Sequence, residues 1–148
     1  MTPFESLVSQ LAAATGLPLE VDARDSCSLE TDGLVITLQY RRGRDDLVIF
    51  AHVTEPDAEL APETLRSALA LACHGEGTHG NFLGLFGGAL LLSAVLPLEG
   101  LDADALAARL LAFSDTALGV RATLAVPVAA PEDSPPADGT QADWNILV

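Results

Sequence analysis

The sequence contains no lysine, and seven arginines face 21 acidic residues. The net charge of −14 excludes ordinary nucleic-acid binding, because a strongly acidic surface repels phosphates. The same charge favours solubility, or a protein partner of basic or mixed charge. The residues after Met1 include neither the basic region nor the apolar run of a secretory signal peptide, so a cytosolic protein is expected.

Cysteine is also scarce. In a reducing compartment Cys27 and Cys73 are best interpreted as free buried thiols rather than as a disulfide or a catalytic thiol. With 148 residues, nearly half of them hydrophobic, the chain is long enough for one domain with an adequate core.

The stretch Asn81–Leu98 contains almost no charge. As a helix it would only just reach membrane-spanning length, and its glycines, Pro97 and lack of basic flanks disfavour that interpretation. Interpreted as strands, the stretch consists of Phe82–Phe86 and Ala89–Leu96, joined by Gly87-Gly88. A Gly-Gly pair between two apolar runs is a signal for a β-hairpin. Because both faces of this hairpin are apolar, we expect it to lie centrally in a sheet or to face another subunit.

A helix is predicted to begin at Pro3, with Thr2 and Glu5 forming a capping box, and to end at Gly16. One side of this helix carries an apolar stripe made of Phe4, Leu7, Val8 and Leu11.

Three strands follow as an antiparallel meander: Ser26–Thr31, Leu34–Arg42 and Leu47–Glu55. One face of the meander is clearly apolar. On the other face Val35 and Phe50 lie among polar residues, which is typical either of a protein-binding surface or of a second core layer.

A second helix is predicted from Pro62 to the His74-Gly75 pair. A third helix is predicted to begin after Asp102 as N-cap and to end at Gly119.

Residues from Pro127 onward are acidic and rich in proline, and this composition predicts a disordered tail. The tail contains Trp144–Val148, an apolar segment with the only tryptophan of the chain. This segment is either a frayed end or a tethered motif that docks in a groove.

No group of residues indicates catalysis. Cys73, His74, Glu76 and His79 cluster in a glycine-rich loop, but their spacing matches no standard zinc site. The loop follows a helix rather than a strand, which excludes a phosphate-binding loop. No nucleophile elbow is present. We therefore predict neither a metal nor a cofactor, and no enzymatic activity.

The order of elements, helix, three strands, helix, two strands, helix, resembles the class I type III secretion chaperones of the Tir-chaperone-like family. The resemblance is most specific over Asn81–Gly119, where an apolar strand pair ends in Leu96-Pro97-Leu98 and the next helix begins at Leu101-Asp102. It covers residues 3–122. The loose loop after the second helix and the tail depart from the family pattern.

The resemblance implies an α+β domain over residues 1–126 with an antiparallel twisted sheet covered by helices, followed by the tail at 127–148. It also implies a bacterial cytoplasmic homodimer without membrane insertion. Such a protein binds the N-terminal segment of a secreted effector and keeps it extended for secretion.

Two surfaces are assigned on this basis. The effector-binding residues are expected to be Phe4, Leu7, Leu11, Leu29, Val35 and Phe50. The dimer interface is expected to contain Leu83, Leu85, Leu92, Leu110 and Phe113. Two alternatives stay open: an acidic immunity protein that blocks a folded toxin domain, and a small enzyme or ligand-binding domain.

Overall fold

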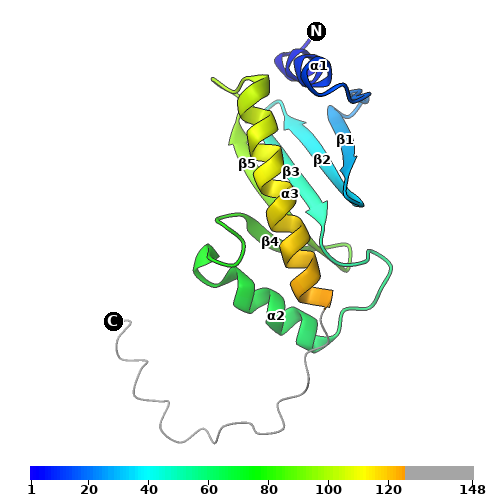
Figure 1. Cartoon of the computed structure of the whole chain (residues 1–148), viewed down its shortest axis with the longest axis vertical. Coiled ribbons are helices and arrows are strands. Elements are labelled where there is room, and N and C mark those ends of the chain that lie inside the picture. The colour runs from blue at the N-terminus through cyan, green and yellow to red at the C-terminus, as the bar shows by residue number, and fades with distance from the viewer. Residues whose placement is uncertain (126–148) are drawn as a thin grey trace, which may run out of the picture.

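The computed structural model describes residues 1–125, which form one layer of helices packed on one antiparallel sheet (Figure 1). The helices are α1 (Pro3–Thr15), α2 (Pro62–Ala72), the short 3₁₀ helix η1 (Cys73–Gly75) and α3 (Ala103–Ala125). The strands are β1 (Ser26–Thr31), β2 (Leu34–Arg41), β3 (Asp46–His52), β4 (Phe82–Phe86) and β5 (Ala89–Pro97). This element order confirms the predicted α+β fold class. The predicted tail at 127–148 lies outside the described residues.

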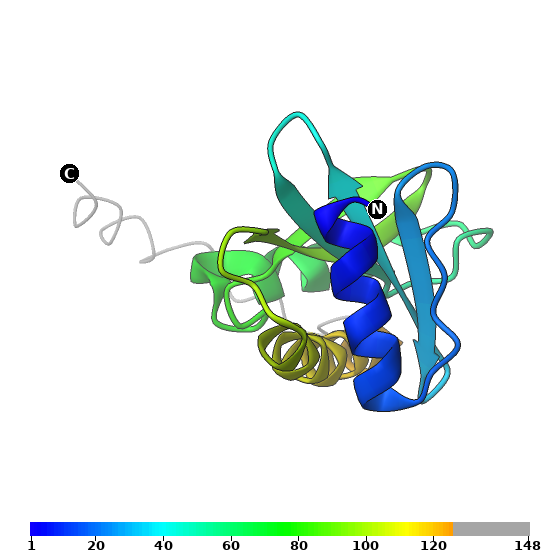
Figure 2. The same ribbon diagram turned by 90° about the horizontal axis from the view of Figure 1, so that it is seen from above.

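The sheet has the strand order β1-β2-β3-β5-β4, with every neighbouring pair antiparallel. Three of these pairs are hairpins between strands that follow each other in the chain. The fourth pair, β3 with β5, joins the N-terminal meander to the C-terminal hairpin. Figure 2 shows α1 and α3 on the same side of this twisted sheet.

The first helix forms as predicted. The Thr2 side chain accepts a hydrogen bond from the Glu5 backbone N–H, and the Glu5 carboxylate accepts one from the Thr2 N–H, which completes the capping box. At the other end Gly16 adopts a left-handed conformation with φ of 72° and closes the helix.

The long apolar stretch is a hairpin. Gly87 and Gly88 both have positive φ, 58° and 80°, as the two-residue turn requires. Leu83 then faces Leu92 across the β4–β5 pair. In residues 1–125 no helix is long and apolar enough to cross a membrane.

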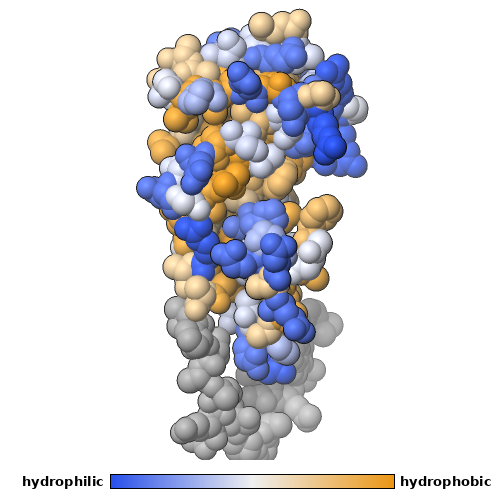
Figure 3. Space-filling model, turned by 90° about the vertical axis from the view of Figure 1, so that its right-hand side faces the viewer, coloured by the Kyte–Doolittle hydropathy of each residue, from blue (hydrophilic) through white to orange (hydrophobic). Residues whose placement is uncertain are grey.

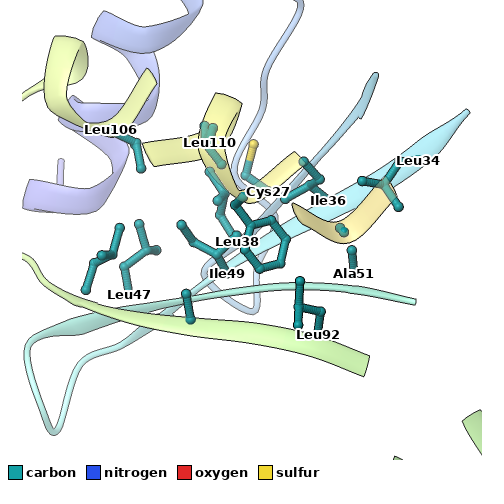
Figure 4. Close-up of a cluster of buried hydrophobic side chains, with 14 of the residues drawn as sticks. Cys27, Leu34, Ile36, Leu38, Leu47, Ile49, Ala51, Leu92, Leu106 and Leu110 are labelled. Carbon is teal, nitrogen blue, oxygen red and sulfur yellow. The ribbon is translucent and has the colours of Figure 1, made fainter. Parts of the chain in front are cut away.

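The core lies between the helices and one face of the sheet (Figure 4). Alternate residues of β2 and β3 point into it, as their two-residue periodicity predicts. The Phe4 ring of α1 stacks on Tyr40 of β2, with ring centroids 5.6 Å apart. From α3 the core receives Leu106, Leu110, Phe113, Ala117, Val120 and Leu124.

The third helix is longer than predicted. It begins as expected, with the Asp102 carboxylate accepting a hydrogen bond from the Ala105 N–H at 2.7 Å. The predicted stop at Gly119 is wrong, because the helix continues to Ala125. A glycine inside a helix costs only about 1 kcal/mol, and burial of Val120 and Leu124 beyond it outweighs that cost.

Two leucines of α3 provide a matched test of the packing. Leu106 is fully buried, whereas Leu111 is 70% exposed. We expect Leu106→Ala to lower the free energy of unfolding by about 2–5 kcal/mol, because it leaves a cavity in the core. We expect Leu111→Ala to change it by less than about 0.5 kcal/mol. Urea titrations at one protein concentration measure both changes, and equal losses for the two variants would contradict this packing.

Candidate protein-binding surfaces

An uncharged groove runs between α1, β1 and α3, and we call it the α1–α3 groove. Its volume is about 190 Å³. It is lined by Leu11, Thr15, Leu17, Leu29, Thr31, Ile36, Ala107, Leu110, Leu111 and Ser114. The side chains of Leu17 and Leu111 are 40% and 70% exposed. Figure 3 views the side of the molecule on which β1 lies and shows hydrophobic surface there between hydrophilic groups.

The residues assigned to effector binding lie in three different places in the structure: the core, the α1–α3 groove and the open face of the sheet. Phe4 and Leu7 are 0% and 5% exposed and belong to the core of the single chain, because α1 turns its apolar stripe toward the sheet. In this conformation neither side chain is accessible to a partner. Leu11 and Leu29 meet in the α1–α3 groove, although Leu11 is only 1% exposed.

Val35 and Phe50 lie on the other side of the sheet, which the helices leave open. Val35 is 53% exposed, whereas Phe50 is half-buried. In the register of the sheet Phe50 faces Thr37 on β2 and Ser93 on β5. Phe82 of β4 faces Ser93 from the other side, so Phe50 and Phe82 share one row of the open face. This face is therefore partly apolar.

A second apolar surface covers β4 and the adjoining part of α2, and we call it the hairpin patch. Its exposed side chains are Leu69, Phe82, Leu85 and Phe86, which are 73%, 63%, 62% and 74% exposed. Between α2 and the hairpin lies an apolar cleft of about 240 Å³ that includes Leu69, Leu83 and Leu85. The strand β4 is at the end of the sheet, and the described chain covers little of its side-chain surface.

The residues assigned to a dimer interface also divide into two groups. Leu85 is prominent on the hairpin patch, and Leu83 is partly buried beside it. By contrast, Leu92, Leu110 and Phe113 are buried within the single chain. The hairpin was expected to be covered on both faces, but its β4 strand exposes apolar side chains on both sides.

The loop between α2 and β4 has a structural role. His79 has positive φ, and its Nδ1 lies 2.9 Å from the Thr116 hydroxyl of α3, so the pair ties the loop to the helix. A pocket of about 460 Å³ lies here, and its lining includes the oppositely charged Arg109 and Asp115. Within residues 1–125 no three His, Cys, Asp or Glu side chains lie close enough together to hold a metal ion.

Arginine–aspartate pairs hold the turns at one end of the meander. Two hydrogen bonds of 2.6 Å join Arg41 to Asp46, and Arg42 pairs with Asp25 in the same way at 2.6 and 2.8 Å. The hydrogen bonds from each guanidinium hold the pKa of the paired carboxyl below its usual value. These charges therefore position the turns.

Sequence reasoning missed part of both apolar surfaces. Neither Leu17 nor Leu111 was assigned to a binding surface. Phe82 and Phe86 were expected either to be buried centrally in the sheet or to face another subunit. Their exposure follows from the position of β4 at the end of the sheet, which the sequence alone does not reveal. The strong apolar character of the hairpin was nevertheless a signal for an interface.

The fold and its two apolar surfaces define a small α+β protein whose described surface is suited to binding other polypeptides. The model of the Tir chaperone protein (CesT) family matches residues 6–121 of the chain. Because this match covers more than half of the sequence, the chain belongs to that family.

Solved structures support the same fold. A chain of the ExsC–ExsE complex is 24% identical, with a TM-score of 0.69 over 85% of this chain and 95% of that chain. A chain of the HopA1–SchA chaperone–effector complex is 21% identical, with a TM-score of 0.64 over 81% of this chain and 94% of that chain. A chain of the complex between the Yersinia pestis type III secretion chaperone SycH and a YscM2 fragment is 20% identical, with a TM-score of 0.59 over 79% and 98%. A comparison with curated protein sequences found no match.

The two cysteines provide a direct check of the burial pattern. Cys27 is 2% exposed and its burial raises the pKa of the thiol, whereas Cys73 is exposed. We expect a thiol-alkylating reagent to modify Cys73 rapidly in the native protein and Cys27 only after unfolding, because the thiolate is the reactive form. Mass spectrometry of the intact protein and its peptides measures this order. Rapid modification of Cys27 in the native state would contradict the structure.

Proposed function

We propose that this protein is a bacterial cytoplasmic chaperone of type III secretion that binds the N-terminal segment of an effector and keeps it extended. The observation that carries the proposal is the match to the Tir chaperone protein family over residues 6–121. The structures named above support it, since one is a chaperone–effector complex and another contains a type III secretion chaperone.

The α1–α3 groove suits an unfolded segment better than a folded surface. It is narrow and uncharged, so it accepts single apolar side chains from an extended chain. An unfolded effector segment presents such side chains at little cost, whereas a folded domain has already buried them. We assign Leu29 and Leu111 as groove contacts, and Val35 and Phe50 as contacts of the open sheet face.

The hairpin patch suits a second copy of the chain. Phe82, Leu85 and Phe86 form an exposed apolar group of the kind that marks interfaces rather than a solvated surface. A homodimer would bury this group in both copies and leave the α1–α3 groove of each copy open. The protein would act by binding alone, without a cofactor or a catalytic step.

The partner is tested by affinity capture from the native cell lysate, followed by mass spectrometry and limited proteolysis. We expect one dominant protein that is protected only along an N-terminal segment. Protection of a compact domain would instead support an immunity protein that blocks a toxin. Absence of any protein partner would favour a small ligand and contradict the proposal.

Substitutions at the groove and on the open face test the contacts. We expect Leu29→Asp and Phe50→Asp each to weaken capture of the effector at least about tenfold, since a charge replaces an apolar contact. The controls Leu29→Met and Phe50→Leu preserve apolar character and should retain capture. Circular dichroism checks the fold, and loss of the fold in Phe50→Asp would show that this side chain is core rather than contact.

The dimer is tested at the hairpin patch. We expect Leu85→Asp to yield folded monomers, because the carboxylate would be buried unpaired in the interface. The control Leu111→Asp, at a residue 70% exposed against 62% for Leu85 but outside the patch, should remain dimeric. By contrast, Leu92→Asp places a charge in the core and should unfold the chain. Light scattering coupled to gel filtration measures the mass, and a Leu85→Asp dimer would refute this interface.

A further inference from the structure

We propose that the apolar segment Trp144–Val148 of this chain occupies its own α1–α3 groove and keeps the groove covered until an effector displaces it. The proposal rests on the proposed function only in naming the effector as the competitor. The segment itself lies outside the described residues, so the argument uses the groove, the end of α3 and the sequence.

The groove and the segment match in chemistry. No charged side chain lines the groove, and aliphatic side chains form most of its wall. Between residues 126 and 148 the sequence has four carboxylates and no basic residue, and Trp144–Val148 is an uncharged run with three aliphatic side chains and the only tryptophan. Burial of such a run in an uncharged groove removes apolar surface on both sides from water.

The distance also fits. The exposed rim residue Leu111 lies on α3, and α3 ends at Ala125. At 1.5 Å per residue these two positions are about 20 Å apart along the helix axis. The chain from Ala125 to Trp144 can reach at most about 65 Å, so its length is sufficient to span this distance. Because the segment belongs to the same chain, its effective concentration at the groove exceeds that of a free peptide.

The other grooves are less suitable. The cavity nearest the end of α3 includes Leu124 and Ala125, but it is a charged site, because Glu55, Glu59 and Arg121 line it as well. The two carboxylates outnumber the single guanidinium and disfavour the acidic chain before Trp144. The cleft beside Leu69 and Leu85 is apolar, but it belongs to the hairpin patch that we assign to a second copy. The pocket beside Arg109 and Asp115 is charged and so is a poor match for an uncharged run. Of the four cavities described for residues 1–125, the α1–α3 groove is therefore the one that is uncharged and not assigned to a second copy.

Because Trp144 is the only tryptophan, fluorescence excited selectively at tryptophan, and not at Tyr40, reports on this segment alone. In the absence of any effector we expect its emission to be blue-shifted from that of the denatured protein and protected from acrylamide quenching. We expect Leu111→Asp to abolish both effects, because the charge lies at the rim of the groove. Val35→Asp and Leu69→Asp are exposed controls in two of the other three cavities and should preserve both effects.

Each other outcome overturns the proposal. Solvent-like emission in the wild-type chain would show that the segment does not dock. Loss of the blue shift in Val35→Asp or Leu69→Asp, with Leu111→Asp unaffected, would place it in another cavity. A blue shift that disappears on dilution would show docking on a second copy.

A competition experiment tests the covering role without an effector. The probe is a labelled synthetic peptide of residues 141–148. We expect it to bind the full-length variant Trp144→Ser/Ile146→Ser/Leu147→Ser at least about tenfold more tightly than the wild-type chain, whose own segment competes at high effective concentration. Equal binding would overturn the covering role. Because no effector is present, these results are independent of whether effector capture succeeds.

Discussion

The packing of α3 across the sheet is the interaction on which the rest of the structure depends. This helix contacts α1, α2 and β2. It therefore connects the N-terminal helix, the sheet and the second helix over one core. Buried side chains recur along one side of this helix from Leu106 to Leu124. Their burial explains why the helix does not stop at Gly119. The α1–α3 groove lies where α1 and α3 meet over β1 and β2, and Leu111 lies at its rim because it points away from the core.

The described helices cover only one face of the sheet. The uncovered face and the incompletely covered hairpin therefore stay available as surfaces for binding. Helices α1 and α3 cover the meander, whereas α2 covers the hairpin incompletely. Because no helix of the described chain covers the other face, Phe82 and Phe86 of the end strand β4 lie in solvent. The acidic charge and the apolar surfaces have different roles. Its net charge limits non-specific association, while the groove and the hairpin patch keep defined places for polypeptide partners.

The sequence predicted the fold well because its local signals agree with the tertiary structure. The Thr2 and Glu5 capping box, the Gly87-Gly88 turn and the two-residue alternation in β2 and β3 each depend on near neighbours only. The candidate site was predicted less well. Whether Phe4 lies in a core or on a surface depends on the direction in which α1 docks, and periodicity does not show that direction. The exposure of Leu85 depends likewise on strand order, which only the complete sheet determines.

The pairing of β3 with β5 has a consequence for how the chain folds. The other three strand pairs are hairpins and close short loops, whereas β3 and β5 meet only after the chain has passed through α2, η1 and β4. Closing a longer loop costs more conformational entropy, and non-local pairing is the slow part of forming a sheet. The meander and the β4–β5 hairpin are thus two local units. Their pairing at β3–β5 completes the single sheet on which α3 packs.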